Sequence, residues 1–144
     1  MDVDVVTEIV IARPRSAVSA YAMNPDHAPD WYVNIKSVEW LTPPPLAIGS
    51  RIAFVAHFLG RRIAYTYEIK TIVAGERLVM QTAEGPFPME TTYEFHDAGM
   101  GTRMTLRNRG TPRGFIAMTA PLMAAAMRRA NRKDLRALQK ILES

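Results

Sequence analysis

The chain contains no cysteine, and this absence removes several kinds of site at once. Disulfide bonds, thiolate nucleophiles and cysteine-ligated zinc or iron–sulfur centres all require that residue. Histidine is also scarce. Only His27, His57 and His96 are present, and their spacing fits neither a metal site nor a nucleophile paired with a base. We therefore expect no metal and no cofactor, and the sequence marks no catalytic residue.

Long uninterrupted apolar runs are missing as well. Charged residues break the apolar stretches every few positions, whereas a membrane-spanning helix needs about 20 consecutive apolar residues. The first four residues, Met1-Asp2-Val3-Asp4, lack the basic start and the apolar run of a signal peptide. The sequence therefore predicts no integral membrane segment and a cytoplasmic location.

The composition is that of an ordinary globular protein. The chain has 144 residues, of which 48% are hydrophobic and 22% are charged. This length suits one domain that spans residues 1–144. Nothing in the pattern indicates an oligomeric state.

The net charge is +4, so the position of the basic residues decides whether nucleic acid is an expected partner. Many of them fall between the apolar positions of the last predicted helix, where they should face solvent. They are Arg128, Arg129, Arg132, Lys133, Arg136 and Lys140. No RNA-binding signature, zinc finger or recognition helix accompanies them, so we expect no nucleic-acid partner. Weak contact with an acidic protein or membrane surface is the alternative.

The first forty residues predict one strand followed by two short helices. Residues 3–11 are rich in β-branched side chains and alternate loosely, which is typical of a strand. Pro14 suits the first turn of a helix that Asn24-Pro25 would end, and Asp26 is expected to cap a second helix. The second helix should hold Trp31, Tyr32 and Ile35. A strand is then predicted at residues 38–41.

Residues 51–59 and 62–73 predict a β-hairpin, because they flank Gly60-Arg61, a two-residue turn with glycine first. With Leu59 opposite Arg62, the cross-strand pairs are Phe58 with Ile63, Ala56 with Tyr65, Phe54 with Tyr67 and Ile52 with Ile69. We expect this apolar and aromatic face to point inward. The opposite face should be solvated, and it carries Ala53, Val55, His57, Thr66, Glu68 and Lys70.

A further strand is predicted at residues 78–83, before a second hairpin formed by residues 89–95 and 102–108. With Phe95 opposite Thr102, the inward pairs are Tyr93 with Met104 and Thr91 with Leu106. The outward pairs are then Glu94 with Arg103 and Glu90 with Arg107. We expect these arginines to be partners in exposed salt bridges rather than a phosphate site.

Residues 115–142 predict a long amphipathic helix whose apolar stripe should face the sheet. The stripe consists of Ile116, Ala120, Met123, Met127, Ala130, Leu138 and Ile141, with Leu135 and Leu142 alongside. Pro121 is expected in the first turn of the main helix, and a hinge at that position is the alternative.

Six short motifs give the chain a resemblance that covers nearly its whole length. They are Ala28-Pro29-Asp30-Trp31-Tyr32, Gly49-Ser50-Arg51, Tyr67-Glu68-Ile69, Gly75-Glu76-Arg77-Leu78, Gly101-Thr102-Arg103-Met104-Thr105-Leu106 and Arg132-Lys133-Asp134-Leu135. Together they resemble the SRPBCC or START-like superfamily, specifically its polyketide cyclase/dehydrase-like branch. The resemblance implies an α+β helix-grip fold. In that fold a curved seven-stranded antiparallel sheet wraps around a long C-terminal helix, two short helices follow the first strand, and a deep pocket lies between sheet and helix.

We interpret the chain as a protein that binds a small hydrophobic ligand such as a lipid, polyketide or isoprenoid in that pocket, with transport of the ligand as an additional option. Apolar and aromatic side chains with several phenols are the usual lining of such a site. The predicted ligand-binding residues are Trp31, Tyr32, Phe54, Phe58, Tyr65, Tyr67, Met80, Tyr93, Phe95, Met104, Met123 and Met127, and Met118 would extend the same wall. A filled core without a ligand is the alternative.

Two other functions stay open. A cofactor-free cyclase, aromatase or dehydratase needs only to orient its substrate and stabilise an enolate, and this leaves no sequence motif. Tyr65, Tyr67 and Tyr93 could polarise a carbonyl for such a reaction, and His27 or Asp30 is the acid–base candidate at the pocket mouth. The remaining hypothesis is a protein-interaction module resembling the chaperone co-activators of the superfamily.

Overall fold

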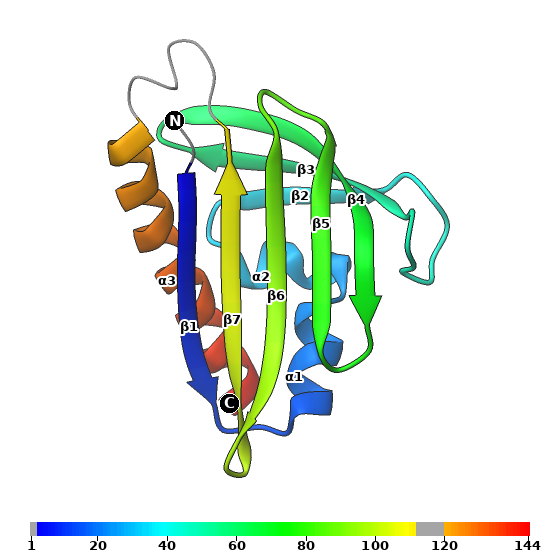
Figure 1. Ribbon diagram of the computed structural model, residues 1–144, viewed down its shortest axis with the longest axis vertical. Helices are drawn as coiled ribbons and strands as arrows, with labels where there is room; N and C mark the ends of the chain where they lie inside the picture. Colours follow the sequence, from blue (N-terminus) through cyan, green and yellow to red (C-terminus); the bar gives the residue numbers. More distant parts are fainter. Residues whose placement is uncertain (1–2, 112–119) are drawn as a thin grey trace.

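The computed structural model describes residues 3–111 and 120–144, and Figure 1 shows its ribbon. Its strands are β1 (Val3–Ile11), β2 (Ile35–Trp40), β3 (Arg51–Phe58), β4 (Arg61–Val73), β5 (Arg77–Glu84), β6 (Met89–Ala98) and β7 (Gly101–Gly110). Its helices are α1 (Arg15–Ala22), the 3-10 turn η1 (Pro25–His27), α2 (Ala28–Trp31) and α3 (Ala120–Glu143).

The strands form one seven-stranded antiparallel sheet in the order β1-β7-β6-β5-β4-β3-β2. The sheet curves, so that β2 and β3 run across the direction of β5, β6 and β7 (Figure 1). In the same view α3 runs alongside β1, and α1 and α2 lie behind the sheet. This architecture is the predicted α+β helix-grip fold.

β1 shows how the residue pattern sets the inner face of the sheet. Val3, Val5 and Ile11 are buried, whereas Asp4 and Glu8 are exposed. Successive side chains on a strand point to opposite faces, so β1 buries Val3, Val5, Thr7 and Ile11 on one face and exposes Asp4, Val6, Glu8 and Val10 on the other. Val3 and Val5 pack in a cluster with Met123 and Met127 of α3. The predicted strand is confirmed, and its inner face meets the C-terminal helix.

The short helices after β1 differ from the prediction at the second one. Asn24, not Asp26, supplies the cap, because its Oδ1 accepts a hydrogen bond of 3.0 Å from the backbone N–H of Asp26. The segment then forms the 3-10 turn η1 and the four-residue helix α2, which ends at Trp31. Ile35 therefore belongs to strand β2 rather than to the helix. The helical turn begins at Pro25, so the cap position falls on Asn24, and Asp26 already lies inside the turn.

The first hairpin forms one residue earlier in the chain than predicted. Leu59 and Gly60 are the two central residues, and both have positive φ, 52° and 74°, as a type I′ turn requires. Phe54 therefore faces Tyr65 rather than Tyr67, and Ile52 faces Tyr67. The register differs from the prediction by two residues. Because side chains alternate with a period of two, the predicted inner and outer faces are unchanged. Thr66, which was expected to be solvated, is buried where the pairing of β4 with β5 becomes irregular.

The second hairpin shows the same two-residue difference. Its strands extend to Ala98 and Gly101, which pair around Gly99-Met100, so Phe95 faces Met104. The predicted pairs Glu94–Arg103 and Glu90–Arg107 are therefore wrong. Arg109 approaches Glu90 at 3.7 Å, and the guanidinium of Arg107 binds Asp4 of β1 at 2.6 Å. Arg107 does form an exposed salt bridge, as predicted, but with another partner, and Arg103 forms none with the residues that the structure describes.

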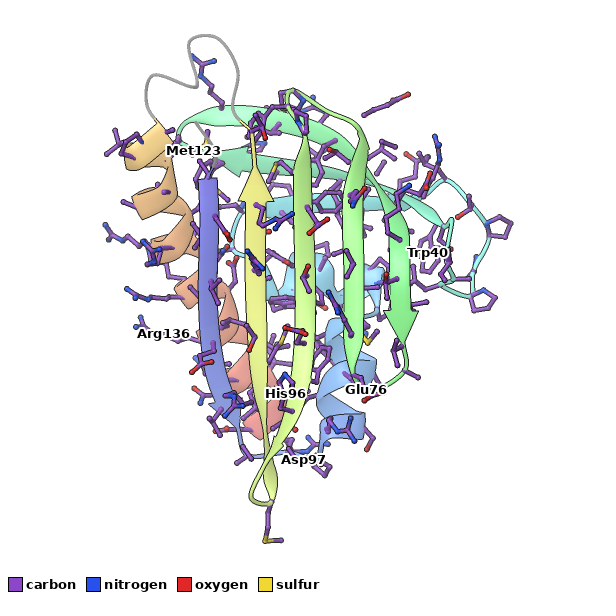
Figure 2. All side chains as sticks on the ribbon, in the orientation of Figure 1. Trp40, Glu76, His96, Asp97, Met123 and Arg136 are labelled. Carbon is purple, nitrogen blue, oxygen red and sulfur yellow. The ribbon has the colours of Figure 1, made fainter. Side chains whose placement is uncertain are left out.

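α3 presents a buried stripe to the sheet and its basic residues to solvent. The buried residues are Ala120, Met123, Met127, Asn131, Asp134, Leu135, Leu138 and Leu142. Ala130 and Ile141 are only half-buried, so they lie beside the buried stripe, although the prediction placed them on it. Arg136 points away from the sheet (Figure 2). No helix in residues 3–111 and 120–144 is long and apolar enough to cross a membrane.

Pro121 lies in the first described turn of α3, in agreement with the expected position. The alternative prediction, a hinge at Pro121, depends on the segment that precedes Ala120. Residues 112–119, which include the predicted positions Ile116 and Met118, lie outside the described residues.

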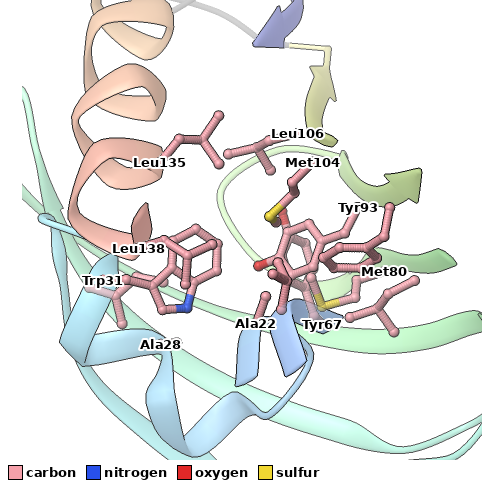
Figure 3. Close-up of a cluster of buried hydrophobic side chains, with 14 of the residues drawn as sticks. Ala22, Ala28, Trp31, Tyr67, Met80, Tyr93, Met104, Leu106, Leu135 and Leu138 are labelled. Carbon is pink, nitrogen blue, oxygen red and sulfur yellow. The ribbon is translucent and has the colours of Figure 1, made fainter. Parts of the chain in front are cut away.

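The main core lies where the second half of α3 meets the sheet. Leu135 and Leu138 face Met104 and Leu106 of β7, and Trp31 of α2 lies beside Leu138 (Figure 3). Leu138, Met104 and Leu106 are completely buried. This contact fixes α3 on the concave face of the sheet.

Leu138→Ala is expected to lower the free energy of unfolding by about 2–5 kcal/mol, because it opens a void in this contact. Leu122, on the same helix, is 69% exposed, and Leu122→Ala should change stability by less than about 0.5 kcal/mol. Urea denaturation of both variants measures the difference. Equal losses would contradict the described position of α3.

Candidate functional site

A cavity of about 140 Å³ lies between α3, the short helices and the inner face of the sheet. One buried water needs about 10–15 Å³ of such space, and a cavity of about 150 Å³ in another protein takes up benzene. The space therefore suits a small organic molecule. Its walls are mainly apolar, with phenol, amide and carboxyl groups at a few positions.

Nine of the twelve predicted ligand-binding residues line this cavity. They are Tyr32, Phe54, Phe58, Tyr65, Tyr67, Met80, Tyr93, Met123 and Met127. The structure places the other three, Trp31, Phe95 and Met104, in the packed core, where they are 1%, 2% and 0% exposed. Strand phase makes Phe95 and Met104 face inward, but Met104 faces Leu135 and Leu138 of α3 (Figure 3), and Phe95 belongs to the same packed core cluster. That the nine residues contact a ligand stays a prediction.

Three aromatic residues form one wall of the cavity. The ring centroids of Phe54 and Tyr65 are 5.6 Å apart, those of Tyr65 and Tyr67 5.1 Å, and those of Phe54 and Tyr67 6.0 Å. Adjacent positions on β3 and β4 hold them in place, because Phe54 pairs with Tyr65. Packed aromatic rings provide a rigid apolar surface against which a flat ligand can lie.

A buried chain of hydrogen bonds runs from this wall across the sheet. The Tyr67 hydroxyl lies 2.7 Å from Thr91 Oγ1, and Thr91 Oγ1 donates to Asn108 Oδ1 at 2.6 Å. Tyr67, Thr91 and Asn108 are all buried and line the cavity. Burial raises the pKa of Tyr67 to about 12.

A second polar group lies nearer to the helices. The hydroxyls of Tyr32 and Tyr93 are 2.5 Å apart. Burial is the main reason that the pKa of each is raised well above the ordinary value, and the charge of Asp134 raises both further. Both phenols therefore stay protonated at neutral pH and act as hydrogen-bonding groups.

Asp134 brings a carboxyl group to the same region. The residue is 3% exposed, and its Oδ1 accepts a hydrogen bond of 2.8 Å from the backbone N–H of Val33. Burial raises the pKa of Asp134 to about 7, although the bond from Val33 lowers it in part. A carboxyl that titrates near neutral pH, beside two phenols in an apolar cavity, can accept and return a proton.

Asn131 lies one turn before Asp134 on the same side of α3. It lines the cavity and is 5% exposed. Its Nδ2 has no hydrogen-bond partner among the residues that the structure describes. Leaving a buried donor unpaired costs about 1–3 kcal/mol.

Sequence reasoning missed Thr91, Asn108, Asn131 and Asp134 as site residues, although a signal for the last two was present. Asn131 and Asp134 continue the buried stripe of α3 at helical spacing after Met123 and Met127. A polar residue in the middle of an apolar stripe is unusual enough to mark a site. Thr91 and Asn108 carry no such signal, because threonine is common in strands and Asn108 stands at the end of the predicted strand.

The expected mouth residues His27 and Asp30 lie outside the cavity lining. The ring of His27 stacks on Tyr21 with centroids 4.0 Å apart, and its Nδ1 lies 3.1 Å from the Tyr21 carbonyl. Asp30 is exposed on α2. Within residues 3–111 and 120–144, no three histidine or carboxylate side chains gather as metal ligands would.

An antiparallel sheet curved around one long helix, with an apolar cavity between them, defines the START-like helix-grip class of protein. Within that class, the chain belongs to the family described as polyketide cyclase / dehydrase and lipid transport, whose sequence model matches residues 2–143. No curated protein shows a significant sequence match to the chain.

Several solved structures share the fold at low sequence identity. The Zhui aromatase/cyclase of Streptomyces sp. R1128 is 15% identical, with a TM-score of 0.85 over 99% of this chain and 94% of that one. A START superfamily protein from Mycobacterium smegmatis is 12% identical, with a TM-score of 0.85 over 98% and 97% of the two chains. A protein from Thermus thermophilus is 21% identical, with a TM-score of 0.83 over 95% and 94%. At these identities the likeness concerns the fold.

Asp134→Asn is expected to remove part of the pH dependence of stability. The carboxyl titrates near pH 7 in the folded chain, against an ordinary value of 3.8. Between pH 3.8 and about pH 7, the folded state therefore binds more protons than the unfolded state. The free energy of unfolding therefore falls as pH rises, by at most about 1.4 kcal/mol per pH unit. Asparagine can keep the bond from Val33 but cannot ionise, so the variant should lose this slope.

Denaturant unfolding of both proteins from about pH 4 to about pH 8 measures the effect. The variant should gain stability relative to the wild type as pH rises through this range. A constant difference between the two proteins would show that the carboxyl is not desolvated as described.

Proposed function

We propose that the protein binds a small, largely apolar molecule with one or two oxygen functions in the cavity between α3 and the sheet. The observation that carries this proposal is the cavity of about 140 Å³, lined by aromatic and methionine side chains together with a few buried polar groups. Sites for small molecules commonly combine such walls with few, well-placed hydrogen-bonding groups.

The buried polar side chains of the lining indicate that the cavity is a binding site rather than a void left by imperfect packing. Asp134 and Asn131 are buried in α3, and Thr91 and Asn108 are buried in the sheet. Burying a carboxyl or an amide lowers stability unless hydrogen bonds compensate it, and an apolar residue would fill the same place at lower cost. A ligand that bonds to these groups supplies a reason for their presence. Lipid, polyketide and isoprenoid ligands all fit this description, and the description of the family agrees with it.

Phe54→Ala should weaken binding of the small neutral probe indole by about tenfold, because an aromatic contact of about 0.5–1.5 kcal/mol is lost together with buried area. Isothermal titration calorimetry measures the affinity. His57, on the same strand, is exposed on the outer face, so His57→Ala is the matched control. Equal affinity in wild type and Phe54→Ala would place the probe elsewhere and sink the proposal.

A second candidate function is acid–base catalysis of a cyclisation or dehydration without a cofactor. The observation that favours it is Asp134, whose pKa of about 7 suits a group that takes and returns protons at neutral pH. In a dehydration, the Asp134 carboxylate would take a proton from the carbon next to a carbonyl. The neighbouring hydroxyl would leave as water after receiving a proton from the Tyr32–Tyr93 pair, which Asp134 then restores.

The water adduct of benzalacetone, a β-hydroxyketone, is a suitable test substrate, because its dehydration produces a conjugated enone that absorbs in the near ultraviolet. Asp134→Asn should lower the rate by about 100-fold or more while the substrate still binds. Asp30→Asn, which changes an exposed carboxylate outside the cavity lining, should leave the rate unchanged. Catalysis that survives in Asp134→Asn would exclude this second function and leave binding as the role of the cavity.

A further inference from the structure

The hydrogen bonds of the cavity have directions, and these directions restrict what a ligand can offer. Thr91 has one hydroxyl proton, and it is donated to Asn108 Oδ1. The 2.7 Å bond between Tyr67 and Thr91 must therefore carry the proton of Tyr67. The Tyr67 hydroxyl has no proton left for a ligand, but its oxygen can still accept one. Toward the cavity, Tyr67 is an acceptor.

The Tyr32–Tyr93 pair has the opposite character. Each phenol has one proton, and one of the two is used in the 2.5 Å bond between the oxygens. The other proton has no acceptor among residues 3–111 and 120–144. Burial raises the pKa of both phenols, so this proton stays on the pair at neutral pH. The pair therefore offers a donor to the cavity.

Asn131 adds a donor on the same side. Its Nδ2 is buried and has no partner among the described residues, and the side chain belongs to the cavity lining. The last torsion of asparagine is broad, so the amide can turn an N–H toward an acceptor in the cavity. Trp31 Nε1 is the other buried atom without a partner in the described part of the chain, but Trp31 lies off the lining.

The acceptor and the donors are held at different points of the wall. Thr91, which receives the bond from Tyr67, and Tyr93 lie two residues apart on the same face of β6. That spacing corresponds to about 7 Å along a strand. Asn131 approaches from α3, across the cavity from the sheet. The acceptor and the donors therefore come from different elements around the cavity, Tyr67 from β4 and Asn131 from α3.

We propose that the cavity is built for a cyclic or aromatic hydroxyketone whose carbonyl oxygen accepts hydrogen bonds from Asn131 and the Tyr32–Tyr93 pair, while its hydroxyl donates to the oxygen of Tyr67. This proposal rests on the proposed function and goes further, because it states the class of ligand and how the molecule lies. A hydrocarbon-like lipid satisfies none of these groups.

Three probes of nearly the same shape test the proposal by isothermal titration calorimetry. Para-hydroxyacetophenone carries both functions, para-methylacetophenone replaces the hydroxyl by methyl, and para-isopropylphenol replaces the carbonyl by an apolar branch. We expect the wild type to bind the first probe about fivefold more tightly than either of the others, as a net hydrogen bond of about 1 kcal/mol predicts.

Two variants assign each preference to its residue. Tyr67→Phe should erase the preference for hydroxyl over methyl and keep the preference for the ketone. Asn131→Leu should reduce or erase the preference for the ketone and keep the preference for the hydroxyl. Tyr21→Phe is the matched control, because it removes a phenol outside the cavity lining and should retain both preferences. Thermal unfolding of each variant verifies its fold, and the wild-type ranking alone tests the proposal if one variant fails to fold.

The outcomes separate this inference from the proposed function. Equal binding of the three probes by the wild type would overturn the hydroxyketone assignment and leave a binding cavity in place. Preferences that persist unchanged in both variants would overturn the assignment of Tyr67 and Asn131. Failure of all three probes and of indole to bind would overturn the proposed function together with this inference.

Discussion

The contact of α3 with the concave face of the sheet is the interaction on which the remaining structure depends. Leu135, Leu138 and Leu142 seal one end of this contact against β7 and α2. At the other end Met123 and Met127 pack with Val3 and Val5 of β1. Between these two apolar ends, α3 turns Asn131 and Asp134 toward the sheet, and the cavity lies there. The helix therefore closes the core at both ends and leaves space in the middle.

The same contact explains why polar groups survive in the interior. The bond from the Val33 N–H to Asp134 joins the segment after α2 to α3, so the short helices and the long one meet at the cavity. The sheet contributes its own buried chain through Thr91 and Asn108 on neighbouring strands. An apolar core of the same volume would be more stable, so the retained polar groups indicate selection for a task other than folding. A site of this kind can bind, and with Asp134 it can also transfer a proton.

The sequence predicted the architecture well because alternation with a period of two fixes which residues face inward. Both hairpin registers were wrong by two residues, and neither error moved a side chain to the other face. Turn chemistry caused the error in the first hairpin, since Leu59 adopts a positive φ that leucine rarely takes. The site was predicted less completely. The alternation of side chains along the strands identifies Phe54, Tyr67 and Tyr93 as inward-facing residues. It cannot show which part of the sheet α3 covers or which polar residues of α3 line the cavity.

The proposed occupant of the space beneath α3 is a small, largely apolar molecule. Native mass spectrometry of the purified full chain, followed by solvent extraction and identification of whatever was released, tests that claim most directly. We expect a population heavier than the bare chain by the mass of one small organic molecule with at least one oxygen. We also expect the cavity to fill when such a molecule is added to the unliganded chain. A bare mass under all conditions, with no uptake of added aromatic ketones or phenols, would contradict the account.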